Sequence, residues 1–303
     1  MTTQDRHAAE RAAARADLRS MQDLETEYRA SIQRADAAAL SLGCWLPTLG
    51  RRLRPIVPGE LLFLLADTGV GKSAALQSIA RCARGHIVLF VEMELPGPLL
   101  FERWVAQEQR RPAGEIENMY RNGKSALLVN LLHIWTCQRT RRTVRDIHWM
   151  IEEMATMPCG KPDVVCVDYL GLMGNKAARS PYEAMTQQAQ DLKAMAKTDN
   201  VVVLAATQRH RKENSDGTTK VTLHDARDSG CIEESAGIVI GLWRDKSRPA
   251  TGAFVQILKS TKDGISDAIH CEVNGPSLLI EESAHIGEEP GMPAAFAAEG
   301  MDG

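Results

Sequence analysis

The chain has 303 residues, of which 44% are hydrophobic and 25% are charged, so it can bury the core of one large domain or of one and a half. Its net charge of −3 excludes an overall basic surface, and any contact with nucleic acid must therefore be local. The seven Cys are scattered without a Cys-x-x-Cys pair, which indicates a cytoplasmic protein with reduced thiols rather than disulfides or a zinc site. No apolar run is long enough to span a bilayer.

The N-terminal region, residues 4–40, is rich in Ala, Arg, Glu and Gln, and its apolar residues recur at spacings of three and four. This pattern predicts one or two amphipathic helices with a narrow apolar stripe. Such a helix needs a partner, which is either its own domain or a neighbouring subunit. We therefore treat residues 1–41 as a helical segment or linker, followed by an irregular stretch from Leu42 to Pro58 that contains Gly and Pro.

The next stretch has the pattern of a phosphate-binding loop. A continuous apolar run at 61–65 predicts a strand buried on both faces, and a helical pattern begins at 74. The motif Gly-x4-Gly-Lys-[Ser/Thr] is matched between them except at its first glycine, in the sequence Ala66-Asp67-Thr68-Gly69-Val70-Gly71-Lys72-Ser73. Backbone N–H groups and the helix dipole would bind phosphates here, with Lys72 at the β- and γ-phosphates and Ser73 on Mg²⁺.

Strands and helices alternate after this loop. Apolar runs predict strands at 86–91, 131–136, 163–172 and 201–206, separated by helices at 98–110, from 143 onward and at 180–197. Three more strands are expected at 238–243, 253–258 and 268–273, with a hairpin turn at Lys262-Asp263-Gly264. This order predicts an α/β fold with a mostly parallel, doubly wound sheet and an antiparallel C-terminal extension. The tail at 283–303 is expected to be disordered.

Polar side chains stand at the carboxyl ends of the predicted strands, where open α/β sheets bind their ligands. Asp168 ends a buried strand, where an unpaired carboxylate is costly, so it is a candidate ligand of Mg²⁺. Glu94 could polarise an attacking water, but Glu92 lies two residues away on the same face and spacing alone does not choose between them. Gln208 could sense the γ-phosphate, although a strand-end Gln, like a strand-end Asp, can also be a simple loop cap.

With these motifs in place, the sequence resembles the RecA-like motor domain of DnaB-type hexameric replicative helicases over about residues 42–282. The phosphate-binding loop is similar to the loop of that family, which also often opens with Ala. The segment Val88-Leu-Phe-Val-Glu-Met-Glu94-Leu-Pro96-Gly97 is similar to the family's motif ending Leu-Glu-Met-Pro-Gly, and this Pro-Gly anchor assigns the catalytic carboxylate to Glu94. The stretch from 164 to 173 looks like the Asp-Tyr-Leu-x-Leu-Met metal-binding strand, and Thr207-Gln208 is similar to the family's Ser-Gln sensor.

Two later motifs extend the resemblance. Trp243-Arg244-Asp245 matches a Tyr-Arg-Asp landmark, which adds Arg244 to the nucleotide-binding candidates, and the segment 226–233 looks like the loop with which family members grip single-stranded DNA. The resemblance thus implies ATP and Mg²⁺ as cofactors, a homo-oligomer expected to be a hexameric ring in DNA replication, and partners such as a primase or loader. The candidate DNA ligands are the groups at 175–179 and 209–230, namely Lys176, Arg179, Arg209, Arg211, Lys212, Arg227, Asp228 and Gly230.

Three features depart from the family pattern. The family's N-terminal domain, which helps form the ring collar and bind primase, is missing, and only about forty residues precede the motor. The family's Lys-x-Arg-Asn-Gly hairpin reaches into the neighbouring ATP site; here it reads Ser260-Thr-Lys262-Asp-Gly264, so that Lys262 replaces the arginine finger. The loop at 209–225 is long and strongly charged.

We therefore interpret the chain as the ATP-hydrolysing motor of a DnaB-type DNA helicase. The rival interpretation is a RecA-like oligomeric ATPase that acts as a switch, assembly or recombination factor without unwinding DNA. The Arg227-Asp-Ser-Gly230 loop favours the helicase, whereas Lys262 and the short N-terminal segment favour the rival.

Overall fold

The computed structural model describes residues 11, 15, 20–26, 28–29, 39–174, 178, 180–209, 220–223, 225, 231–244, 252–264 and 266–283. The chain divides into two units, Met1–Ala39 and Leu40–Gly303. In the first unit, residues 21–26 and 28–29 are helical, as the amphipathic pattern predicts. Ser20 and Asp23 cap this helix reciprocally, since each side chain accepts the backbone N–H of the other residue, at 2.8 and 3.0 Å.

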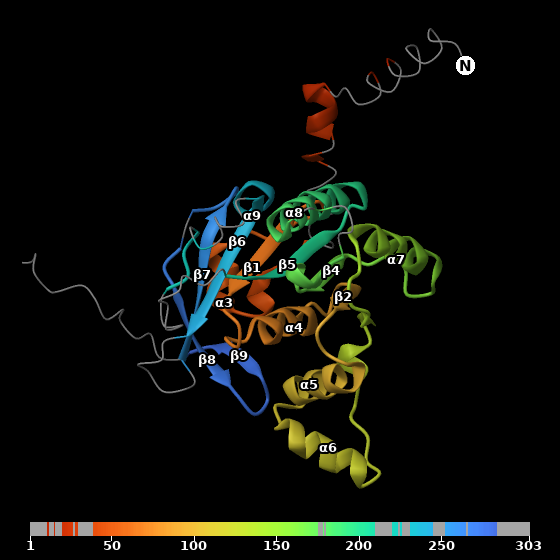
Figure 1. Cartoon of the computed structure of the whole chain (residues 1–303), viewed down its shortest axis with the longest axis vertical. Helices are drawn as coiled ribbons and strands as arrows, with labels where there is room; N and C mark the ends of the chain where they lie inside the picture. Colours follow the sequence, from red (N-terminus) through yellow and green to blue (C-terminus); the bar gives the residue numbers. More distant parts are fainter. Residues whose placement is uncertain are drawn as a thin grey trace, which may run out of the picture. The chain divides into compact units, whose positions relative to one another are not determined.

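The second unit is built on one sheet, which has the strand order β3-β2-β4-β5-β1-β6-β7-β8-β9 in the described part of the chain (Figure 1). The strands from β1 to β6 pair in parallel, and β7, β8 and β9 continue the sheet in antiparallel pairs. This confirms the predicted α/β sheet with an antiparallel extension. The strands are β1 Leu61–Ala66, β2 Val88–Glu92, β3 Ile134–Cys137, β4 Val164–Asp168, β5 Val202–Gln208, β6 Ile238–Arg244, β7 Gly252–Ser260, β8 Ile269–Asn274 and β9 Leu279–Glu282.

Helices cover both faces of this sheet, and Figure 1 shows α4 and α5 on the side opposite α7 and α8. The helices are α3 Pro47–Arg52, α4 Lys72–Cys82, α5 Gly97–Gln109, α6 Ala113–Arg121, α7 Val144–Thr156, α8 Pro181–Thr198 and α9 Cys231–Ser235, with short 3₁₀ turns at Leu42–Cys44, Val129–Leu131 and Leu170–Leu172.

The central strand β1 explains why the apolar run is continuous. Leu62 and Leu64 pack into the hydrophobic cluster that contains α4 residues, whereas Leu61, Phe63 and Leu65 pack into the cluster formed with α7 and α8. Alternate side chains of a strand point to opposite faces, so a strand with helices on both faces needs apolar residues at every position.

Helix ends follow the predicted capping chemistry. The Ser180 side chain accepts the backbone N–H of Glu183, and Pro181 occupies the first position of α8. Thr143 and Asp146 form a complete capping box at the start of α7. These local signals therefore located the starts of both helices to the residue.

Some boundaries and elements differ from the sequence-based prediction. The stretch from Leu42 to Pro58, expected to be irregular, contains the helix α3, with Pro47 at its first position. The strand expected at 163–172 ends at Asp168, because Leu170–Leu172 form a 3₁₀ turn. The strand β9 was not predicted, since it is only four residues long and pairs with β8 alone. Among the described residues, no helix is both long and apolar enough to cross a membrane.

Candidate nucleotide-binding site

The phosphate-binding loop connects β1 to α4, as predicted. Gly69 and Gly71 have φ angles of 78° and 113°, a region that favours glycine, and Gly71 is the N-cap of α4. A Cβ atom on Gly71 would also lie 3.2 Å from Ile280 Cδ1. Ala66, by contrast, is the last residue of β1 and packs fully buried in the apolar core, so a side chain is accommodated where the general motif has its first glycine.

A cavity of about 290 Å³ opens above this loop. Groups from five parts of the fold line it: the phosphate-binding loop with α4, the segment after β2, helix α5, the ends of β4 to β6, and the β8–β9 turn. The lining residues are Asp67, Thr68, Gly69, Gly71, Lys72, Ser73, Ala74, Glu94, Arg103, Tyr169, Gln208, Arg244 and Leu278. The structure therefore brings most of the predicted nucleotide-site residues to one place.

Lys72 and Asp168 form the charged centre of this region. The Lys72 Nζ lies 3.5 Å from Asp168 Oδ1 and 4.5 Å from the centre of the Tyr169 ring. Asp168 is fully buried, and neither of its carboxylate oxygens has a hydrogen-bond partner in the described part of the chain. A buried carboxylate without such partners is costly unless it is paired or binds a cation. Asp168, together with the Ser73 hydroxyl at the cavity, is thus a chemically suitable ligand set for Mg²⁺, which takes few protein ligands when it also binds substrate phosphates.

The two candidate catalytic carboxylates occupy different environments. Glu94 is exposed and lines the cavity. Glu92, at the end of β2, is fully buried and pairs in register with Asp168 of β4. Burial raises the pKa of Glu92 to about 7, with a further contribution from the negative charge of Asp168. Only Glu94 is therefore placed where it can reach a water molecule in the cavity.

Gln208 and Arg209, neighbours in sequence, point to different surroundings. Gln208 is exposed at the cavity, and its side-chain amide donates a hydrogen bond to the Thr68 hydroxyl. Arg209 is buried; its Nε lies 3.2 Å from Asp67 Oδ1, and its guanidinium lies 3.7 Å from Asp225 Oδ2. Arg209 thus holds the end of β5 against the phosphate-binding loop, and its contact with DNA phosphates stays a prediction that would require it to leave these two carboxylates.

Two arginines add positive charge to the cavity. Arg244, predicted from its motif, donates from Nε to the carbonyl oxygen of Val70 at 3.0 Å and so supports the loop backbone. Arg103 on α5 was not predicted. The sequence places Arg103 in the helix that follows Glu94. It does not show which face of that helix lines the cavity, so Arg103 could not be selected from the sequence.

Lys262 lies in the β7–β8 connection and interacts with its own subunit. Its Nζ is 2.6 Å from Glu60 Oε2 and 3.3 Å from the carbonyl oxygen of Pro55. Arg54 also binds this turn through Asp263 and through the carbonyl oxygen of Lys262. The other predicted DNA ligands, Lys176, Arg179, Arg211, Lys212, Arg227, Asp228 and Gly230, lie outside the described residues, as does the tail beyond Ser283.

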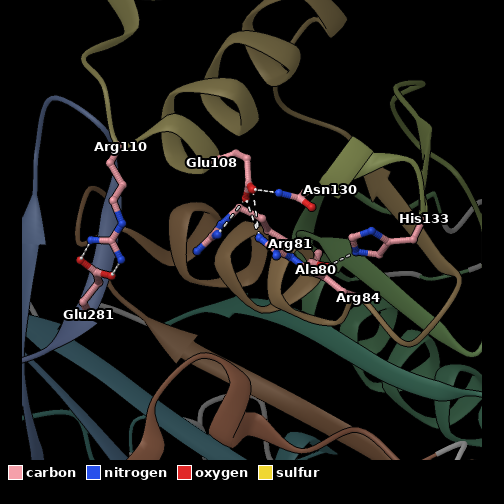
Figure 2. A network of polar contacts seen from close by, with 8 residues as sticks. All are labelled: Ala80, Arg81, Arg84, Glu108, Arg110, Asn130, His133 and Glu281. Carbon is pink, nitrogen blue, oxygen red and sulfur yellow. Dashed lines mark hydrogen bonds and ion pairs between the residues drawn. The ribbon is translucent and has the colours of Figure 1, made fainter. Parts of the chain in front are cut away.

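A polar network holds α5 against α4, the helix of the phosphate-binding loop, and Figure 2 shows its members. Glu108 on α5 accepts hydrogen bonds from Arg81 at 3.0 Å, Arg84 at 2.9 Å and Asn130 at 2.6 Å. Burial by itself would raise the pKa of Glu108, but the bonds from Asn130 and Arg81 and the charge of Arg84 outweigh it and lower this pKa. The network therefore fixes the C-terminal end of α5. The N-terminal end of the same helix begins at Gly97, three residues after Glu94.

Further contacts join the same end of α5 to the β8–β9 hairpin. The Gln107 side chain donates to the carbonyl oxygens of Ala74 on α4 and of Leu278, at 3.3 and 3.0 Å. Arg110 forms a two-bond ion pair with Glu281, at 2.9 and 2.6 Å, which is also visible in Figure 2. Hydrogen bonds and an ion pair thus connect α4, α5 and the β8–β9 hairpin, three of the elements that line the cavity.

Comparison with known proteins places this arrangement in a family. The family described as DnaB-like helicase C terminal domain matches residues 44–274. The replicative DNA helicase DnaB of Mycoplasma genitalium is 26% identical over 202 residues, which are 62% of this chain and 43% of that protein. The DnaB of Leifsonia xyli is 24% identical over 250 residues, 76% of this chain and 53% of that protein. The chain therefore spans about half the length of these curated relatives.

Solved structures share the fold. One of them, described as an ATPase domain, has a TM-score of 0.74 at 21% identity, and the match covers 88% of this chain and 100% of that one. A DnaB-like replicative helicase, studied with its primase interactions, has a TM-score of 0.72 at 22% identity, over 88% of this chain and 68% of that chain. At these identities the likeness concerns the fold alone.

Proposed function

The chain belongs to the family of DnaB-like helicase C-terminal domains, and from this premise we propose that it is the ATP-hydrolysing motor of a DNA helicase that acts in replication. The observation that carries the proposal is the cavity itself. It combines a phosphate-binding loop, an exposed carboxylate and a strand-end glutamine, beside a buried carboxylate without hydrogen-bond partners in the described residues. Parallel strands deliver these groups to one edge of the sheet, where such folds bind their ligands.

Each residue has a distinct task in this proposal. The loop amides and Lys72 bind the β- and γ-phosphates, and Ser73 and Asp168 would hold Mg²⁺. The cation, when bound, supplies charge neutralisation at the phosphates. Glu94 orients and deprotonates the attacking water. Gln208 contacts the γ-phosphate, and its side-chain amide is hydrogen-bonded to Thr68 of the phosphate-binding loop. Arg103 and Arg244 add positive charge at the cavity.

The proposal extends to an oligomer on single-stranded DNA. The groups proposed to contact DNA phosphates are Lys176, Arg179, Arg209, Arg211, Lys212, Arg227 and the Gly230 amide, and Asp228 lies beside them in the same loop. Arg209 would first have to leave Asp67 and Asp225. Lys262 is proposed to reach the ATP site of a neighbouring subunit, for which it would have to leave Glu60. We also propose that the oligomer is a hexameric ring, that its partners include a primase or a loader, and that it is cytoplasmic. The rival, an ATPase switch without unwinding, is not favoured by the family match.

The test combines two measurements on the same preparation. ATP hydrolysis should rise when single-stranded DNA is added, and a forked duplex should be unwound only with ATP and Mg²⁺. Lys72→Ala should abolish both activities because the charge at the γ-phosphate is lost, whereas Arg110→Ala, which removes an exposed cation outside the cavity, should leave both intact. ATP hydrolysis without any unwinding would support the rival function, and unchanged turnover in Lys72→Ala would refute the nucleotide site.

A further inference from the structure

Glu92 has an unusual position for a carboxylate. It ends β2, is fully buried and does not line the cavity. Its Oε1 accepts two backbone hydrogen bonds, from the N–H of Glu94 at 2.8 Å and from the N–H of Leu95 at 3.0 Å. The N–H of Met93 donates to the carbonyl oxygen of Asp168 at 3.0 Å. Three consecutive N–H groups after β2 are therefore held, one by the β4 backbone and two by a single side-chain oxygen.

These bonds determine where the chain goes after the strand. Backbone N–H groups that leave a sheet lose their ladder partners and need new ones when buried. A carboxylate that accepts two of them offers short, charge-assisted bonds and stabilises a tight turn in place of further strand. Here the turn brings Glu94 to the cavity and lets α5 begin at Gly97.

Glu92 occupies this place despite an unfavourable environment. It lies in register with Asp168, so two buried carboxylates end neighbouring strands, and its second oxygen, Oε2, has no hydrogen-bond partner in the described part of the chain. An apolar side chain would avoid this electrostatic cost. The two bonds to the turn are therefore what the buried carboxylate contributes to the structure.

We propose that Glu92 is a positioning residue for hydrolysis, which holds the backbone of Glu94 and Leu95 so that the Glu94 carboxylate is fixed at the phosphate cavity. Glu92 itself binds neither nucleotide nor water. This rests on the proposed function, in which Glu94 activates the water. A displacement of about 1 Å in a reacting group can lower the rate on the order of 10²-fold, so the loss of these two bonds should be visible in turnover.

The test compares side chains of similar size that differ in their acceptor. Glu92→Gln keeps an oxygen that can accept both N–H groups and should retain most of the turnover. Glu92→Leu fills the same space without an acceptor and should lower kcat by about 10²-fold while the dissociation constant for ATP stays unchanged. A smaller pair repeats the comparison if Leu does not fold: Glu92→Ser retains a hydroxyl acceptor, Glu92→Ala does not, and both leave the same space behind.

Two further measurements separate positioning from general destabilisation. In a Glu94→Gln background, Glu92→Leu should cause no further loss of turnover, because the residue that it positions is already inactive. Hydrogen exchange should accelerate at the amides of Glu94 and Leu95 in Glu92→Leu but not in Glu92→Gln. Equal turnover in the Gln and Leu variants, or equal losses in both backgrounds, would overturn the proposal. Full activity of Glu94→Gln alone would instead refute the proposed catalytic carboxylate.

Discussion

The Glu108 network makes a quantitative prediction for the stability of the second unit, Leu40–Gly303. Glu108 has a side-chain exposure of 11% and Arg81 one of 15%, whereas the side chains of the Arg110–Glu281 pair are exposed to 67% and 44%. Removing one partner of a buried ion pair typically costs about 3–5 kcal/mol, because the other charge stays buried, whereas an exposed pair contributes about 0–1 kcal/mol. Arg81 keeps some contact with water, so we expect Glu108→Ala to lower the free energy of unfolding by about 2–4 kcal/mol.

Chemical denaturation of matched variants measures this difference. Glu281→Ala, which removes the acid of the exposed pair in the same region, should cost less than about 1 kcal/mol. The pKa of Glu108 is lowered in the folded state, so its stabilisation is present above the ordinary pKa of the group and is lost as the pH falls through the folded value. The stability gap between wild type and Glu108→Gln should therefore narrow in acid. Equal losses for Glu108→Ala and Glu281→Ala, or a gap independent of pH, would refute this account.

Four other predictions can be checked separately. Arg103→Ala should lower ATP turnover or affinity while Arg103→Lys restores part of it, which steady-state kinetics and nucleotide binding would show; no effect would mean that this cation has no contact with the nucleotide. Lys262→Ala should lower turnover without weakening ATP binding, Lys262→Arg should preserve or raise it, and mixing Lys262→Ala with Lys72→Ala subunits should restore some activity if the residue acts in trans. Binding to single-stranded DNA should weaken steeply with salt, and Arg227→Ala should weaken it for all sequences alike; a salt-insensitive affinity would contradict the phosphate contacts. The hydrogen bond to Asp199 raises the pKa of His148, so this link between α7 and the end of α8 should stabilise most below the ordinary histidine pKa and fade as the pH rises through the folded value; denaturation of His148→Gln and wild type at pH values on both sides would test it.

The sequence by itself was sufficient for the elements whose signals are local. A buried strand, a glycine-rich loop and a helix start follow one another directly, so the phosphate-binding loop with Lys72 and Ser73 could be recognised before any packing was known. The caps of α7 and α8 are equally local, because each is complete within four residues. The order of strands and helices then required a parallel sheet, and a parallel sheet brings Asp168 and Gln208 to the edge where Lys72 lies.

What the sequence could not determine is which charges are available for chemistry. Arg209 and Lys262 are ordinary cations in loop-like sequence, yet one is buried against Asp67 and Asp225 and the other binds Glu60. Arg103 looks like a surface residue of a helix but lines the cavity. The Pro-Gly anchor selected Glu94 over Glu92 from the sequence, but only the structure shows that Glu92 is buried. Burial and ion pairing depend on partners that are far away in the chain, so only the tertiary structure decides which charged groups line the cavity and which are paired away from it.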